Sequence, residues 1–339
     1  MLSGTSQPHR PSTASVQSQS SSASDQALTQ FSKTWAKRYV EQVRDHQVLG
    51  LLNQDTVSRH AIVQELSQLL RPVSVNAWAR TEKLLSEEVI HHQIPRDLVD
   101  PWAISRDVYQ IYDQAFSSYA NERSPERFAI NINAELGQIR AKYTAVDPRV
   151  IGFVSMQFHY TGQIFLDAIP PFHQDTLKLF FKVIDDHLYM PLHRAYEAAA
   201  QYAQNAPELQ TIHHLIPESS QIAKRIVELV DRAFPGYQCY SGPLSSPAVK
   251  VSSIRDVEMF QMYLWVCLLE KNMYAVQQEL FPLCVMLYPR LKVSWELVRK
   301  MLELLEVEFE VLLTPSEYEL CWPYLQSMSQ LFAQDVVDQ

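Results

Sequence analysis

Glycine most restricts what this chain can fold into, because only 7 of its 339 residues are glycine. An average protein contains about 7% glycine, roughly three times this share. β-Sheets need glycine in tight hairpin turns and at bulges, whereas helices use it mainly just past their C-terminal ends. The shortage of glycine therefore predicts an all-α protein before any periodicity is considered.

The N-terminal tail differs in composition from the rest of the chain. Residues 1–26 are rich in Ser, Thr, Gln and Pro and nearly lack large apolar side chains. Such a segment cannot bury enough surface to offset the entropy that it would lose on ordering. We therefore expect this tail to be disordered.

Helical periodicity begins directly after the tail. Apolar residues recur every three or four positions, starting with Phe31, Trp35 and Tyr39, which is the spacing of one face of a helix. Comparable patterns continue to the C-terminal end of the chain. We expect a helical bundle over residues 27–150 and a second helical domain over residues 151–339.

Prolines and residue types suggest where individual helices end. Residues 56–71 predict a helix that stops at Pro72, with Ile62, Leu66 and Leu69 facing inward.

Two later segments are less regular. Residues 150–165 are rich in β-branched and aromatic residues, which favours a strand by propensity, but their length and apolar spacing favour a buried helix. Pro191 lies inside the helical region 173–203 and predicts a kink or break there.

Charge and composition argue against several classes of function. The formal net charge is −9, and a surface of that sign repels phosphate backbones, so we expect no nucleic-acid partner. No apolar run reaches the ~18 residues of a membrane-spanning helix, and no apolar signal-peptide core follows the first residues. The four cysteines form no CxxC pair. We expect a cytoplasmic protein with reduced cysteines and no membrane insertion.

Motifs of the common enzyme families are missing from the sequence. It contains no Walker loop, dinucleotide fingerprint, nucleophile elbow or kinase signature. We expect a protein without enzymatic activity, and therefore no catalytic residues.

Some histidines and carboxylates lie at spacings that metal sites also use. Glu88 and His91 form a Glu-x-x-His step, but a di-iron bundle needs two such steps and two further glutamates. The doublet of His91 and His92 falls near a predicted helix end, where an imidazolium complements the helix dipole. We expect ion pairs or solvated helix faces here and no metal site.

A second group of such residues has the same interpretation. Residues 185–187 read Asp-Asp-His, and His193 and Glu197 follow on one helix face. His159 lies among apolar residues, where a hydrogen-bonded core histidine is commoner than a haem ligand. None of these residues is expected to bind a metal or haem.

A more specific signal is the order of features between residues 219 and 305. In chain order they are an aromatic-Pro-Gly-Tyr step, a Ser-Ile-Arg-Asp step, an aromatic-rich helix, a short break and the start of a further amphipathic helix. The residues are Phe234 to Tyr237, Ser253 to Asp256, Met259 to Leu264, Glu270 to Asn272 and Val293 to Trp295. In this order the segment resembles the globin-like domain of the phycobiliproteins, the light-harvesting subunits of phycobilisomes. The resemblance extends more weakly over residues 180–335.

The chain departs from that family at the pigment site. There a cysteine two residues before the arginine carries an open-chain tetrapyrrole (bilin) through a thioether, and Ser253 stands at that position here. Because a hydroxyl is a far weaker nucleophile than a thiolate, covalent bilin is not expected. The resemblance implies that Arg255 would pair with a bilin propionate and that Asp256 would accept from pyrrole N–H groups, as a vestigial tetrapyrrole site. The alternative is that both residues cap the start of the following helix.

The resemblance also implies a function. Residues 1–180 have no counterpart in antenna subunits, which favours a non-enzymatic phycobilisome-related protein with a structural, assembly or regulatory role in photosynthetic light harvesting. Its partners would be phycobilisome components, at the cytoplasmic face of thylakoids. Two alternatives stay open: a helical protein-interaction or signalling module unrelated to light harvesting, and a sensor that binds haem or another tetrapyrrole non-covalently.

One segment carries more apolar side chains than a single amphipathic face requires. Phycobiliprotein helices that precede the globin core pack against a second subunit, so an interaction surface is expected around Phe181, Ile184, Tyr189 and Tyr196. Either another protein or the N-terminal half of this chain must cover it. Coverage from within is the preferred interpretation, because residues 27–150 also need an apolar surface to pack against.

Overall fold

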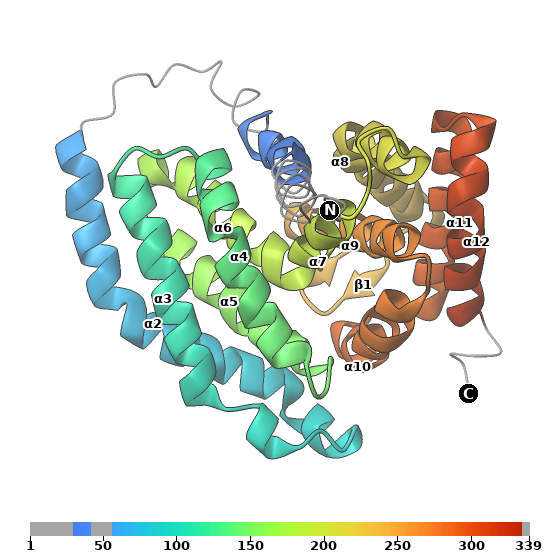
Figure 1. Cartoon of the computed structure of the whole chain (residues 1–339). Helices are drawn as coiled ribbons and strands as arrows, with labels where there is room; N and C mark the ends of the chain where they lie inside the picture. Colours follow the sequence, from blue (N-terminus) through green and yellow to red (C-terminus); the bar gives the residue numbers. More distant parts are fainter. Residues whose placement is uncertain (1–29, 42–55, 334–339) are drawn as a thin grey trace, which may run out of the picture.

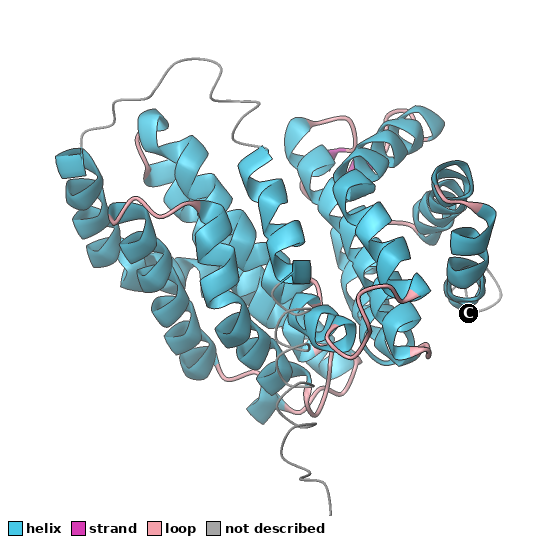
Figure 2. Ribbon diagram, turned by 45° about the horizontal axis from the view of Figure 1, so that its top comes forward, coloured by secondary structure: helices cyan, strands magenta, loops and turns pink. Residues whose placement is uncertain are grey.

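The computed structural model describes residues 30–41 and 56–333, the side chains of residues 56–58 excepted. The predicted disordered tail, residues 1–26, lies outside this description. The described chain is almost entirely helical, as expected, with one small hairpin of β1 (Gln238–Cys239) and β2 (Gly242–Pro243) (Figure 2). None of its helices is both long and apolar enough to cross a bilayer.

The helices form two groups that are consecutive in sequence (Figure 1). The N-terminal group comprises α2 (Thr56–His91), η1 (Arg96–Leu98), α3 (Pro101–Ala120), α4 (Pro125–Thr144), α5 (Val150–Ala168) and α6 (Pro171–Tyr189). The C-terminal group comprises α7 (Leu192–Ala199), α8 (Pro207–Ala233), α9 (Pro247–Glu270), the π-helical turn η2 (Ala275–Leu280), α10 (Phe281–Leu291), α11 (Trp295–Leu312) and α12 (Pro315–Leu331). In the first group α2 packs on α3 and α5, and α6 packs on α4 and α5; in the second α9 packs on α7 and α8.

Side-chain caps fix where many of these helices begin. An oxygen of the residue before the helix accepts a hydrogen bond from a backbone N–H of the first turn at Asp100, Ser124, Ser246, Ser294 and Thr314. Proline follows directly in four of these five cases, since its fixed φ suits the first helical position and it has no N–H to leave unpaired.

The predicted helix at residues 150–165 is confirmed as α5, and the predicted break at Pro191 separates α6 from α7. The predicted end at Pro72 is wrong, because α2 continues through this proline to His91, and Figure 1 shows it bending along its length. Leu69, predicted to face inward, is 42% exposed, whereas Leu70 is buried.

A short helix at residues 30–41 lies between the two groups (Figure 1). Arg38 forms a buried ion pair with Glu258 of α9, and the Tyr39 hydroxyl donates a 2.9 Å hydrogen bond to Asp186 of α6. This helix therefore joins the N-terminal group to the C-terminal group.

A single hydrophobic cluster runs through both groups. Its helices meet closely where side chains are small: a Cβ added at Gly137 of α4 would lie 2.4 Å from Cγ of His193 on α7. The predicted boundary at residue 150 stays a prediction, because helices on both of its sides share this core.

Candidate functional site

Arg255 and Asp256, the predicted vestigial site, lie inside α9 rather than at its start. The helix begins at Pro247, where the Ser246 side chain accepts a hydrogen bond from the N–H of Val249. The alternative that Arg255 and Asp256 cap this helix is therefore wrong. As consecutive helical residues they point about 100° apart, so they contact different parts of Tyr189 and otherwise have different neighbours.

Asp256 faces α6 and a pocket. Its Oδ1 accepts a 2.8 Å hydrogen bond from the hydroxyl of Tyr189. Burial raises the pKa of Asp256 above its ordinary value, against the opposing effects of Arg255 and of this hydrogen bond. Burial, together with Asp256, also raises the pKa of Tyr189, so its hydroxyl keeps its proton at neutral pH and remains a donor.

Arg255 is paired within the chain. Its guanidinium lies over the ring of Tyr189, 4.4 Å from the ring centroid, and its Nη1 is 3.5 Å from Oδ2 of Asp185. Nδ1 of His159 is 2.8 Å from the same oxygen. These contacts join α5, α6 and α9, so a ligand carboxylate would have to compete with Asp185 for this guanidinium.

The pocket beside Asp256 lies between α8, α9 and α11. Its cavity volume is about 70 Å³, well below the range of about 300–1,000 Å³ for small-molecule pockets. Its lining is mostly apolar, with Ile226 from α8 and Met301 from α11, while α9 contributes the polar groups of Ser253 and Asp256. In this arrangement the pocket admits a small apolar group with a hydrogen-bonding atom directed at α9.

The cysteines near this region are weak nucleophiles. Cys239 lines the same pocket, and burial, with a contribution from Asp256, raises the pKa of its thiol. Cys267 is buried, and burial raises its pKa to about 11. Because the thiolate is the reactive form, these raised pKa values make both thiols poorer nucleophiles than an exposed cysteine.

The predicted interaction surface is covered by the chain itself. Phe181, Ile184, Tyr189 and Tyr196 are all buried, and the ring of Phe31, from the helix at residues 30–41, contacts Tyr196 at a centroid distance of 5.1 Å. Of the two alternatives for this face, the described residues show coverage from within. These four side chains therefore offer no surface to a partner in this arrangement.

The side chains of the Asp-Asp-His segment on α6 point in different directions, because they are consecutive residues of one helix. Asp185 contacts His159 and Arg255, whereas Asp186 contacts Lys182 at 2.9 Å. His187 is buried, with Nδ1 2.8 Å from the Val183 carbonyl oxygen. The three side chains point to three different partners and do not share a site.

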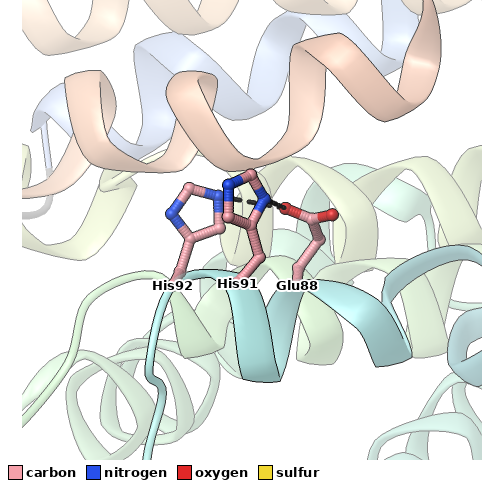
Figure 3. Close-up of side chains that lie close together, drawn as sticks. All are labelled: Glu88, His91 and His92. Carbon is pink, nitrogen blue, oxygen red and sulfur yellow. Dashed lines mark ion pairs between the residues drawn. The ribbon is translucent and has the colours of Figure 1, made fainter.

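Glu88, His91 and His92 instead converge at the C-terminal end of α2 (Figure 3). Within the described residues they are the group whose ligand-type atoms lie close enough together to hold a metal ion, all within 4.8 Å of one another. The sequence patterns paired Glu88 with His91 and assigned the His91-His92 doublet to a helix end, but did not combine the three residues. The Glu-x-x-His-His pattern could have revealed the group, because positions i, i+3 and i+4 share a helix face.

No protein-family model, curated protein or solved structure matches the chain. The resemblance to phycobiliproteins therefore rests on the sequence features alone.

Proposed function

We propose that the chain is a non-enzymatic relative of the phycobiliproteins with a structural, assembly or regulatory role at the phycobilisome, and that it carries no covalent bilin. The observation that supports this most is the pocket at Ser253 and Asp256. In the family that the sequence resembles, this point of the helix is where the pigment is held.

Two features of the site favour a role in contacts between proteins over light capture. Ser253 offers a hydroxyl where a thiolate would be needed for attachment, and Arg255 is paired with Asp185. The part of the chain before residue 180, which has no counterpart in antenna subunits, would supply the surfaces that distinguish this protein from them.

Co-sedimentation tests this proposal. The purified full-length chain is mixed with phycobilisomes from photosynthetic cells and pelleted through sucrose over a range of concentrations. We expect saturable pelleting above the level of an unrelated acidic helical protein of similar mass. Pelleting that equals this control at every concentration would overturn the proposal.

The mostly apolar lining of the pocket, at the position where the family that the sequence resembles holds its pigment, favours a second candidate, a protein that binds a tetrapyrrole non-covalently. Titration with biliverdin or haem, followed by absorbance, is the direct measurement. Ser253→Phe would fill the pocket and abolish the spectral change. Ser252→Phe is the matched control, because Ser252 donates to the Val249 carbonyl at 2.9 Å and is not among the pocket residues. No spectral change with the unaltered chain, or equal changes in both variants, would exclude this candidate.

A further inference from the structure

The Glu88, His91 and His92 cluster lies where α2 ends against α10 (Figure 3). Oε1 of Glu88 accepts a hydrogen bond from Nε of Arg290 on α10, while Oε2 faces the two imidazoles. The Glu88 side chain is 3% exposed, so Arg290 and the surrounding core restrict its orientation. A carboxylate held in this way presents one fixed oxygen to a ligand.

Two of the three separations between the ligand-type atoms are close to those of a zinc site. Nε2 of His92 is 3.0 Å and Nδ1 of His91 is 3.8 Å from Oε2 of Glu88. With Zn–N bonds of about 2.0–2.1 Å, tetrahedral ligand atoms lie roughly 3.3 Å apart. These two separations fall on either side of that value, and all three atoms lie within 4.8 Å of one another, so side-chain rotations would bring them to one ion.

Charge also permits a cation here. Nη1 of Arg290 lies 2.8 Å from Glu87, and Nε of Arg290 contacts Glu88. The two carboxylates therefore outweigh the one guanidinium before any ion binds.

We propose that Glu88, His91 and His92 form a binding site for one divalent transition-metal ion of the zinc type. The ion is held by Oε2 of Glu88, Nδ1 of His91 and Nε2 of His92. The His91 side chain is 73% exposed, so the fourth coordination position opens to solvent, where water or a ligand from outside the chain completes the tetrahedron. Because Glu88 also binds Arg290, the ion strengthens the contact between α2 and α10.

Isothermal titration with ZnCl₂ tests the site, with the full-length chain free of any histidine tag and stripped by chelator. We expect saturable binding of about one ion per chain. His91→Ala should weaken this binding at least about tenfold. Because His91 is exposed, this variant should keep the helical circular dichroism of the parent.

His214→Ala is the matched control, because His214 forms a similar histidine–glutamate contact, 3.2 Å from Glu317, elsewhere on the surface. It should leave zinc affinity unchanged. Cobalt(II) gives a second readout: the parent should show the intense visible absorption of a tetrahedral ion, and His91→Ala should lose it. No saturable zinc binding by the parent, or the same affinity in His91→Ala, would overturn the proposal and leave these contacts as hydrogen bonds alone.

Discussion

At the scale of single residues, helix geometry decides what neighbouring side chains can do. Arg255 and Asp256 are adjacent in sequence and both contact Tyr189, yet only Asp256 lines the pocket and only Arg255 pairs with Asp185. The sequence identified the pair through the Ser-Ile-Arg-Asp step. It could not identify the partners, because these come from another helix and their proximity depends on how α6 packs against α9.

The hydrogen bond between Tyr189 and Asp256 should be measurable as stability. In Tyr189→Phe the carboxyl group loses this donor, and we expect the free energy of unfolding to fall by about 1–3 kcal/mol. Urea denaturation followed by circular dichroism measures it. Tyr274→Phe removes a hydroxyl from a side chain that is 64% exposed and should change stability by less than about 0.5 kcal/mol. Equal effects of the two substitutions would show that the buried hydrogen bond contributes nothing.

The buried imidazole of His187 should make the free energy of unfolding depend on pH. Burial lowers its pKa from 6.5 to about 4, because the folded state favours the neutral imidazole. As the pH falls from about 6.5 to 4, the unfolded chain binds a proton that the folded chain does not, so the free energy of unfolding decreases. The shift corresponds to about 3 kcal/mol.

Urea denaturation at several pH values between 7 and 4 tests this prediction. His187→Leu should lose less stability than the parent across this range, by about 3 kcal/mol at pH 4. His214→Ala changes an exposed histidine and should follow the parent closely. Parallel curves for His187→Leu and the parent would contradict the assignment of a neutral buried imidazole.

At the scale of helices, the sequence predicted the type of element better than its ends. The apolar spacing of residues 150–165 predicted a helix although their propensity favours a strand, and this prediction was correct. The prediction failed at Pro72, because the buried side chains of α2 continue on both sides of it, as Leu70 and Val73 show. A proline inside a helix costs about 3 kcal/mol, and packing of α2 against α3 and α5 offsets that cost in a way that local sequence does not reveal.

The helix at residues 30–41 is expected to depend on its buried ion pair. Arg38 contacts Glu258, and although burial alone would raise the pKa of Glu258, Arg38 and Lys182 hold it at about 2. Arg38→Ala leaves this buried carboxylate without its main partner and should lower the free energy of unfolding by about 3 kcal/mol or more. Urea denaturation is again the measurement.

Lys37→Ala is the control for that substitution, because it removes the same charge from the neighbouring residue, whose side chain is exposed. It should change the free energy of unfolding by less than about 0.5 kcal/mol. A loss as large as that of Arg38→Ala would indicate a general effect of charge or helix propensity rather than the docking of this helix.

At the scale of the whole molecule, composition alone predicted the all-α class, since the shortage of glycine leaves little material for sheets. Coverage of the apolar surface of α6 and α7 by the chain itself was the preferred of two alternatives, and the burial of Phe181 and Tyr196 supports it. The proximity of Glu88, His91 and His92 could be predicted from the sequence, because the three residues are close along the chain. The contact of Glu88 with Arg290 could not be predicted, because it joins the two helix groups.

The function of the molecule is tested most directly in cells that build phycobilisomes. The tagged chain is expressed there, phycobilisomes are isolated, and the denatured fractions are examined on a gel with zinc-enhanced fluorescence and tag detection. We predict that the chain is found with the phycobilisomes and that its band, at about 39.1 kDa plus the tag, shows no bilin fluorescence. A chain that stays apart from the phycobilisomes, or a fluorescent band at this mass, would contradict the account.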